Sequence, residues 1–260
     1  MPRLAANLAY LFTERPPLER FAAAAAAGFT AVELQTPYDQ PAAAVRREIE
    51  RHGLTMLGIN TPAASGGENG VAGVPGREQE FDALFRRALD YAAAIGARTI
   101  HCLTGRVPVE QTDAAEGVFA VNLARAADLA ARQGIGLLIE PLNRRDRPEN
   151  LLHLPEQAAA IIAKVARPNV RMQFDFYHVQ IEAGDLTNRF QRALASVGHV
   201  QVAAVPSRAE PDEGEVNYAN LLGMIDRSGY AGWVGCEYKP RARTEDGLGW
   251  ASAYGIGAGA

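Results

Sequence analysis

The sequence predicts a single (β/α)8 TIM barrel, and three observations support this fold class. Short β-like runs alternate with alanine-rich helical runs along the 260 residues, which is typical of parallel strands joined by helices. The alternation gives about eight strand–helix units, the number that most often closes into a barrel of about 250 residues. The first strand-like run leads into Thr13-Glu14-Arg15-Pro16, whereas an open doubly wound sheet usually has a glycine-rich phosphate loop there.

Apolar runs, prolines and glycines mark the elements of the first half. The expected strands are Leu4–Leu11, Thr30–Leu34, Leu54–Asn60 and Thr99–Leu103. The expected helices are Pro16–Ala27, Pro41–His52 and Glu78–Ile95. Each is followed by a glycine, the residue that most often ends a helix: Gly28, Gly53 and Gly96.

The second half repeats the pattern. The expected helices are Asp113–Gln133, Pro155–Ala166, Leu186–Val197 and Tyr218–Ser228, and the expected strands are Gly136–Ile139, Val170–Phe174, His199–Ala203 and Trp233–Cys236. A short helix from Thr244 to Trp250 completes the eighth unit. We expect residues 1–260 to form one domain, with residues 251–260 as a Gly/Ala-rich tail.

One long loop interrupts the pattern at residues 61–77. It contains five glycines and two prolines and few apolar residues. Long loops inside compact domains are usually functional, and in a barrel this loop follows a strand on the active face. We therefore expect a functional loop, with a tolerated insertion as the alternative.

Composition and charge argue against several classes of function. The formal net charge of −4 gives no general attraction to nucleic acid or to anionic lipid. Two cysteines, Cys102 and Cys236, are too few for a disulfide framework. No secretory signal precedes the first strand-like run, and the longest small-residue run, Ala22–Ala27, is too short to span a bilayer. We expect a reduced, soluble, cytoplasmic protein with neither nucleic acid nor membrane as a partner.

Four polar residues lie at or near the ends of the last expected strands: Glu140, Asp175, Gln201 and Glu237. One carboxylate at a strand end is often a helix N-cap or the partner of a buried arginine. In a barrel, however, these strand ends converge, and three carboxylates there repel one another unless a cation neutralises them. Carboxylate and amide oxygens suit Mg²⁺ or Mn²⁺ rather than Zn²⁺. The four residues therefore predict one metal site.

Two further residues are candidates for binding a substrate. His178 follows Asp175 in the expected loop Phe176–His178, and a histidine can donate a hydrogen bond or carry a proton. Arg208 follows the seventh strand and could clamp a carboxylate. The alternative for each is a surface loop residue, and for Arg208 taken alone that alternative is the better explanation.

The first four expected strands also carry polar residues: Asn7, Glu33, Asn60 and His101. They could line the other half of the opening. We expect Glu33 to be a structural partner for an arginine, and His101 is equally well explained as a core histidine. Both are therefore left out of the catalytic set.

Several long motifs resemble the hydroxypyruvate isomerase family, a branch of the xylose-isomerase-like barrels that include ketose 3-epimerases and endonuclease IV. They are Ala5–Leu8, Pro75–Glu78, Ile139–Asn143, Gln173–His178, His199–Ala203, Glu210–Tyr218 and Gly232–Pro240. The resemblance runs from about residue 3 to residue 250. It implies that the four polar residues are metal ligands and that Glu140 and Glu237 are also the acid/base pair. Ketose 3-epimerases usually carry histidine where this chain has Gln201, which favours the isomerase branch.

The resemblance implies an isomerase that interconverts hydroxypyruvate and tartronate semialdehyde by 1,2 proton transfer through an enediolate. A divalent metal would stabilise that enediolate. The chain also resembles the sister 2-oxotetronate isomerases in Met1–Arg3, Glu237–Pro240 and Gly247–Trp250. The substrate is thus a small 2-keto hydroxy acid, with 2-oxotetronate as the alternative, and members of these families are often homo-oligomers.

Two functions of other classes remain open. An endonuclease IV-like metal hydrolase would need more histidine ligands than five histidines readily supply. A non-catalytic sugar-acid binder would bind the ligand without proton exchange.

Overall fold

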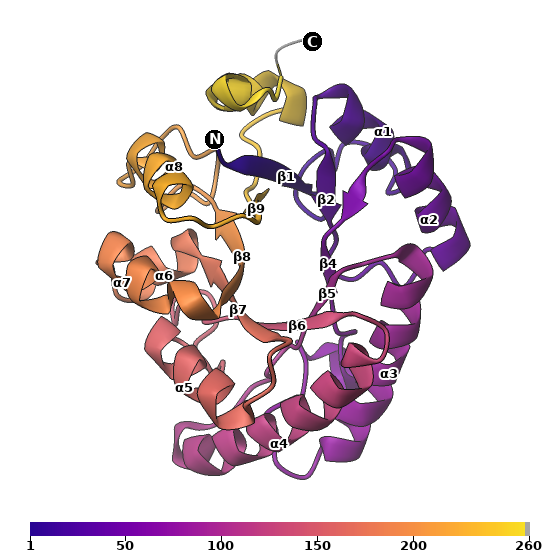
Figure 1. Ribbon diagram of the computed structural model, residues 1–260, viewed down its shortest axis with the longest axis vertical. Helices are drawn as coiled ribbons and strands as arrows, with labels where there is room; N and C mark the ends of the chain where they lie inside the picture. Colours follow the sequence, from indigo (N-terminus) through magenta and orange to yellow (C-terminus); the bar gives the residue numbers. More distant parts are fainter. Residues whose placement is uncertain (258–260) are drawn as a thin grey trace.

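The computed structural model describes residues 1–257, in which nine parallel strands form one sheet with the order β3-β2-β1-β9-β8-β7-β6-β5-β4. Figure 1 shows these strands around the centre of the molecule, with the helices outside them. The strands are β1 (Arg3–Asn7), β2 (Ala31–Glu33), β3 (Thr55–Met56), β4 (Gly58–Asn60), β5 (Thr99–His101), β6 (Gly136–Ile139), β7 (Val170–Asp175), β8 (Val197–Val202) and β9 (Trp233–Cys236).

The two ends of the sheet meet at Leu57, between β3 and β4. The N–H of Leu57 donates to the carbonyl of Val32 in β2 (2.9 Å), and its carbonyl accepts from Thr99 in β5 (3.0 Å). Residues 55–60 thus act as one strand, whose first part pairs with β2 and whose second part pairs with β5. The predicted parallel (β/α)8 barrel is confirmed.

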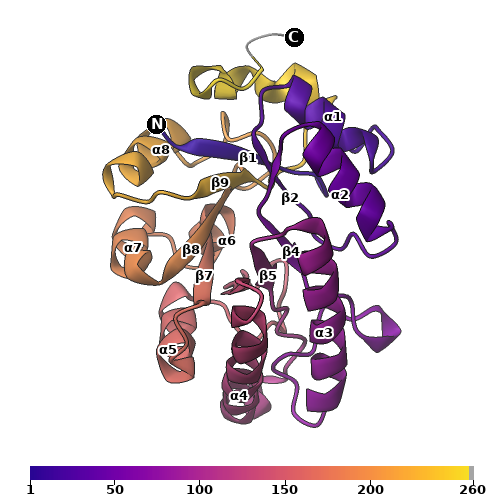
Figure 2. The ribbon, with the colours of Figure 1, turned by 45° about the vertical axis from the view of Figure 1, so that its right-hand side comes forward.

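Helices cover the outer surface of this barrel, as Figures 1 and 2 show. The α-helices are α1 (Glu19–Ala26), α2 (Ala42–Arg51), α3 (Glu78–Ile95), α4 (Thr112–Ala131), α5 (Pro155–Val165), α6 (Phe176–Glu182), α7 (Leu186–Ala193) and α8 (Tyr218–Arg227). The 3-10 helices are η1 (Ser65–Gly67), η2 (Val109–Gln111), η3 (Leu194–Ser196) and η4 (Thr244–Tyr254). In α3, Phe81, Phe85, Ala88 and Ala92 are buried, the spacing of a helix that packs one face on a core.

Three segments differ from the sequence prediction. The expected loop Phe176–His178 is the first turn of α6, because the Asp175 side chain accepts from the N–H of Tyr177 (2.8 Å) and caps the helix. The expected strand Leu4–Leu11 ends at Asn7, whose carbonyl accepts from the N–H of Leu11 (2.8 Å) in a turn. The expected helix Leu186–Val197 ends at Ala193, and β8 already begins at Val197.

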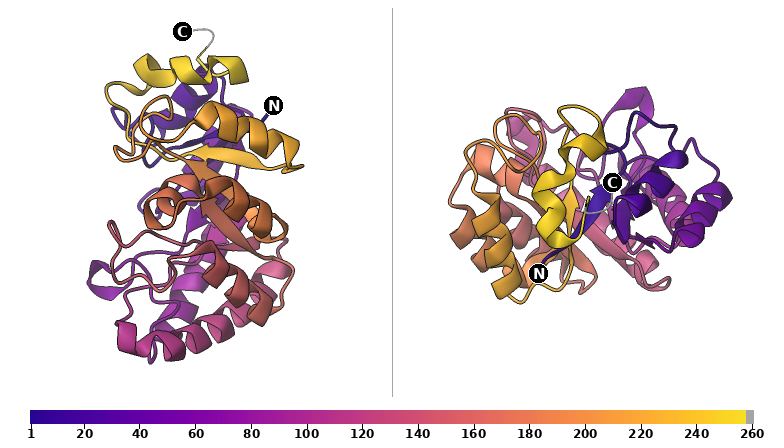
Figure 3. Two further views of the ribbon diagram at one scale, coloured as in Figure 1. Left: turned by 90° about the vertical axis from the view of Figure 1, so that its left-hand side faces the viewer. Right: turned by 90° about the horizontal axis from the view of Figure 1, so that it is seen from above.

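Packed structure continues into the segment that was predicted to be a tail, residues 251–260. The 3-10 helix η4 continues to Tyr254, and the side chains of Ala251 and Ile256 are buried. The N–H of Gly257 donates to the carbonyl of Ala27 (2.8 Å), which attaches the segment beside α1 (Figures 1 and 3). Residues 258–260 lie outside the described part of the chain.

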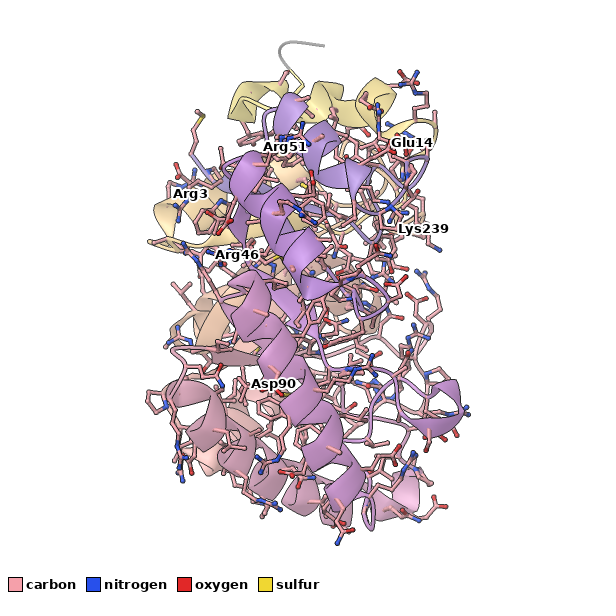
Figure 4. The ribbon with its side chains drawn as sticks, turned by 90° about the vertical axis from the view of Figure 1, so that its right-hand side faces the viewer. Arg3, Glu14, Arg46, Arg51, Asp90 and Lys239 are labelled. Carbon is pink, nitrogen blue, oxygen red and sulfur yellow. The ribbon has the colours of Figure 1, made fainter. Side chains whose placement is uncertain are left out.

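The two ends of the barrel are distinct. Figure 4 shows Arg3, the first residue of β1, at one edge, and Glu14 and Lys239, which follow β1 and β9, at the opposite edge. Loops at the C-terminal ends of parallel strands carry the active site in barrels of this kind. Among the described residues, no helix combines the length and apolar character needed to cross a bilayer.

Candidate active site

The four predicted metal ligands come together at the C-terminal edge of the sheet. Asp175 ends β7, Gln201 lies in β8, and Glu140 and Glu237 directly follow β6 and β9. Their exposed fractions are only 1 to 6%. Glu140 and Glu237 both line a cavity of about 550 Å³ and a smaller inner cavity of about 30 Å³ that Gln201 also lines.

Three of these residues present buried oxygens that have no hydrogen-bond partner in residues 1–257: Glu140 Oε1, Asp175 Oδ2 and Gln201 Oε1. Leaving a buried acceptor unsatisfied is costly, so such atoms usually have a partner. The Gln201 orientation is fixed, because its Nε2 donates to Glu33 Oε1 (2.7 Å) and Glu237 Oε2 (2.6 Å). A set of free oxygens fits a hard divalent cation.

His178 lies close to two of these residues, Glu140 and Asp175. One ligand atom each from Glu140, Asp175 and His178 can be chosen so that all three lie within 4.8 Å of one another, so the three could hold a metal ion. The backbone N–H of Asn143 donates to His178 Nδ1 (3.1 Å), which places the proton of a neutral ring on Nε2. In that tautomer neither ring nitrogen is free to bind a metal ion, because Nδ1 accepts from Asn143 and Nε2 carries the proton. His178 is then a donor, the role predicted for it toward a substrate.

Glu237 has different surroundings from Glu140, because the protein already supplies its partners. It accepts hydrogen bonds from Asn7 (3.0 Å), Gln35 (3.3 Å), Gln201 and Arg208 (2.7 Å). The Arg208 guanidinium, which was predicted to clamp a substrate, therefore pairs with Glu237 and also stacks over Tyr10 and Tyr177.

Burial and mutual repulsion perturb the pKa values of the three carboxylates. Burial, together with the charges of Glu237 and Asp175, raises the pKa of Glu140 well above its usual value. Burial raises the pKa of Asp175 to about 6 and that of Glu237 to about 8, although Arg208 lowers both. A cation at this position would favour the ionised carboxylates and relieve the repulsion.

Burial also favours the neutral form of two histidines near the site, His178 and His101. Burial, reinforced by the nearby Arg208 charge, lowers the pKa of His178 to about 3. Burial, reinforced by His199, lowers the pKa of His101 to about 4. The ring of His101 lies 3.6 Å from Glu140 through Nδ1, so it belongs to the site's lining rather than to the apolar core.

Sequence reasoning missed a buried pair beneath the site. Glu33 was expected to pair with an arginine, and that expectation was wrong: its Oε2 lies 2.5 Å from His199 Nε2. Burial would raise the pKa of Glu33, but His199 and hydrogen bonds from Gln201 and Asn7 outweigh burial and lower it. The signal was present in the period-2 spacing of His199 and Gln201, which puts both on one face of β8.

The comparisons with known proteins agree with this geometry. Residues 21–254 match the family described as xylose isomerase-like TIM barrel. A 2-oxo-tetronate isomerase from Cupriavidus necator is 46% identical over 257 residues, covering 98% of this chain and 99% of that protein. The hydroxypyruvate isomerase of Escherichia coli is 40% identical, covering 98% and 100%.

A solved structure supports the same assignment. It is titled an AP endonuclease, family 2, from Brucella melitensis, and it superposes with a TM-score of 0.95 at 46% identity over 98% of this chain and 99% of that one. Matches of this identity over nearly the full length establish common membership. The chain therefore belongs to the hydroxypyruvate isomerase and 2-oxo-tetronate isomerase family of xylose isomerase-like TIM barrels, and it is a sugar-acid isomerase of that family.

Proposed function

We propose that this enzyme interconverts 2-oxo-tetronate and 3-oxo-tetronate. The resemblance in the sequence motifs favoured hydroxypyruvate as the substrate, with 2-oxo-tetronate as the alternative. The comparisons support the alternative better, because the relative named for 2-oxo-tetronate is 46% identical and the E. coli hydroxypyruvate isomerase is 40% identical.

The observation that carries the proposal is that Glu140 and Glu237 line one cavity from strands β6 and β9, which are separated in the sheet by β7 and β8. In the reaction, one carboxylate takes the C3 hydrogen as a proton. The C3 hydroxyl loses its proton and becomes the carbonyl, and the C2 carbonyl oxygen takes up that proton and becomes a hydroxyl. The proton taken from C3 is returned to C2. Carboxylates that approach the substrate from two sides can perform both transfers.

The free oxygens of Glu140, Asp175 and Gln201 fit the predicted Mg²⁺ or Mn²⁺. Glu237 would be the fourth ligand, through an oxygen released by one of its donors. When bound, the ion supplies Lewis-acid stabilisation to negative charge on the substrate oxygens. The protein holds Glu237 with four donors, so its orientation is set before substrate arrives.

The polar groups of the cavity suit an anionic substrate. His178 Nε2 would donate to a substrate oxygen. Arg208 would also bind the substrate while keeping its contact with Glu237. Arg147 lines the same cavity, and among residues 1–257 its side chain has neither an ion pair nor a hydrogen bond, unlike its neighbour Arg144, which pairs with Glu182. We expect Arg147 to supply positive charge for the substrate carboxylate.

The experiment that tests the proposal compares isomerisation of 2-oxo-tetronate and hydroxypyruvate, each with EDTA-treated and Mn²⁺-reconstituted enzyme. We expect kcat/KM to be about tenfold or more higher for 2-oxo-tetronate, because the pocket can use contacts to the additional carbon and hydroxyl. Activity should disappear with EDTA and return with Mn²⁺. Equal or faster turnover of hydroxypyruvate would contradict the substrate assignment.

Two controls address the other classes of function. In D₂O, an isomerase washes deuterium into recovered substrate, whereas a sugar-acid binder leaves the substrate unlabelled. Incubation with DNA that contains abasic sites, at low salt, tests the endonuclease alternative, and we expect no cleavage.

A further inference from the structure

A second buried carboxylate, Glu33, lies at the end of β2 directly behind the site residues. It is 5% exposed. Its Oε1 accepts from Asn7 Nδ2 (2.9 Å) and Gln201 Nε2 (2.7 Å), while its Oε2 faces His199 Nε2 (2.5 Å). Both oxygens of Glu33 are therefore satisfied inside the barrel, and none of these contacts involves the outer cavity.

The same two amides also contact Glu237. Asn7 Nδ2 and Gln201 Nε2 donate to Glu237 Oε2 at 3.0 and 2.6 Å. Each amide nitrogen thus bridges two carboxylates. Because an ionised carboxylate only accepts hydrogen bonds and the pKa of Glu33 is lowered by His199 and its hydrogen bonds, the Gln201 NH₂ group must face Glu33. Its carbonyl oxygen then faces the other way, and it is one of the unpartnered buried oxygens.

A glycine on strand β9 leaves room for the Glu33 side chain. Gly235 of β9 lies beside Gln201 in the strand register, and a Cβ on Gly235 would come within 2.6 and 2.8 Å of the two Glu33 carboxylate oxygens. The Glu33 carboxylate therefore fills the space that a side chain from β9 would otherwise occupy. A glycine is required there for close approach rather than for backbone freedom.

We propose that Glu33 is a positioning residue that orients the Gln201 amide, so that its oxygen rather than its nitrogen faces the metal site. His199 fixes the Glu33 carboxylate by donating to it. The role rests on the metal site of the proposed function, but it assigns a task to residues outside the ligand set. Without Glu33, a half-turn of the amide would direct its NH₂ group, which cannot ligate a cation, into the site.

The test is the affinity of the purified protein for Mn²⁺, measured by electron paramagnetic resonance of free Mn²⁺ without substrate. Glu33→Gln keeps the size of the side chain but turns one acceptor into a donor, which favours the reversed Gln201 amide. We expect Mn²⁺ to bind about 10- to 100-fold more weakly, the usual effect of removing a group that orients a metal ligand. Glu210→Gln is the matched control, because Glu210 is also buried but accepts from the backbone of Arg241, away from both cavities.

A rescue variant separates orientation from a general loss of structure. In Glu33→Gln/Gln201→Glu, the residue at 201 has an oxygen in both orientations, so Mn²⁺ affinity should return to near the wild-type value. If Glu33→Gln does not fold, as judged by circular dichroism, Gly235→Ala displaces the same carboxylate and should weaken Mn²⁺ binding in the same way.

The outcomes distinguish the two proposals. Tight Mn²⁺ binding by wild type together with unchanged binding by Glu33→Gln and Gly235→Ala would overturn the positioning role and leave the metal site intact. Failure of the rescue variant to regain affinity would also overturn it. An absence of Mn²⁺ binding by wild type would overturn the metal site, and the positioning role with it, while the isomerase assay without metal would still report on the reaction.

Discussion

The two carboxylates proposed to exchange protons, Glu140 and Glu237, have opposite surroundings. Glu237 accepts from four donors that belong to β1, β8 and the loops after β2 and β8. Glu140 has one oxygen without a partner and faces Asp175 and His178. On the Glu237 side of the cavity, the protein therefore supplies the hydrogen-bond donors itself. On the Glu140 side, buried acceptors are left for a ligand.

Hydrogen bonds within the protein fix the orientation of Glu237, whereas Glu140 keeps an acceptor that a ligand can use. A buried oxygen without a partner indicates where a cation or substrate belongs, whereas a fully bonded carboxylate has a fixed orientation. The four predictions below test the contrast, starting with the largest expected effect.

Neutralising either carboxylate should stop catalysis despite their different surroundings. We expect Glu140→Gln and Glu237→Gln each to lower kcat/KM for 2-oxo-tetronate by about 10²- to 10⁴-fold, the usual contribution of a general acid or base. Circular dichroism should show a folded protein in both cases. Glu215→Gln, an exposed carboxylate bonded to Gln180, is the control and should keep normal turnover. A variant with near-normal turnover would remove its residue from the proton-transfer role.

Binding of the substrate carboxylate should depend most on Arg147, which lines the cavity and has no ion pair among residues 1–257. Arg208 is already paired with Glu237, so we expect Arg147→Ala to lower kcat/KM about tenfold or more, the typical value of a hydrogen bond to a charged group. The neutral four-carbon ketose with CH₂OH in place of the carboxylate should lose nothing. Arg144→Ala is the control from the same loop. Equal losses with the charged and neutral substrates would contradict the assignment.

Burial of Glu140 and repulsion from Glu237 and Asp175 should make the stability of the EDTA-treated protein depend on pH. Glu140 has a raised pKa in the folded state, so its contribution to stability is complete below the unfolded value of 4.5 and is lost as pH rises through the folded value. Glu140→Gln removes this loss, so its free energy of unfolding should exceed that of the wild type at pH 8 but not near pH 4. Glu237→Gln should gain less, because it leaves Arg208 without its anionic partner. Urea unfolding at both pH values measures the difference, and a destabilised Glu140→Gln at pH 8 would contradict it.

The smallest expected effect concerns the loop of residues 61–77, whose residues 66–69 line the cavity. Gly70 and Gly66 both have positive φ, +80° and +76°, so alanine costs about 1 to 2 kcal/mol at either position. A Cβ on Gly70 would also lie 2.3 Å from the carbonyl oxygen of Leu103, whereas one on Gly66 meets nothing within 4 Å. Gly70→Ala should therefore have the lower Tm and the higher KM. Equal values for the two variants would show that the loop is not held against residue 103.

The sequence allowed much of the fold and part of the site to be predicted. The glycines that end helices and the apolar runs place the strands within a few residues. Polar residues at the ends of the expected strands identify the candidate ligands Glu140, Asp175, Gln201 and Glu237. Helix α6 was missed because Asp175 has two roles, since one oxygen caps that helix and the other is free. The strand predicted at His199–Ala203 corresponds to β8, but its start was placed too late because Gly198, expected to follow a helix, lies inside the strand.

The hydrogen-bond and ion-pair partners of the residues around the site could not be predicted. The sequence places Glu33, His199 and Gly235 on separate strands. Only the closed barrel shows that the Glu33 carboxylate contacts His199 and fills the space beside Gly235. Similarly, nothing in the local pattern indicates that Arg208 pairs with Glu237 or that Arg147 is left without a partner. These contacts depend on register between strands that are distant in the chain.

The hydrogen bond between Asn7 and Glu237 joins residues 230 positions apart, because β1 is the neighbour of β9 in the sheet. During synthesis on the ribosome, β1 can pair early with β2, but its second neighbour, β9, emerges only after almost the whole chain. A nascent chain that stops short of β9 lacks one of the two sheet neighbours of β1. It also lacks Glu237, one of the two groups proposed to transfer protons. Premature termination in this part of the message would consequently yield an inert product with an exposed strand edge, which is a substrate for chaperones and proteases rather than a partly active enzyme.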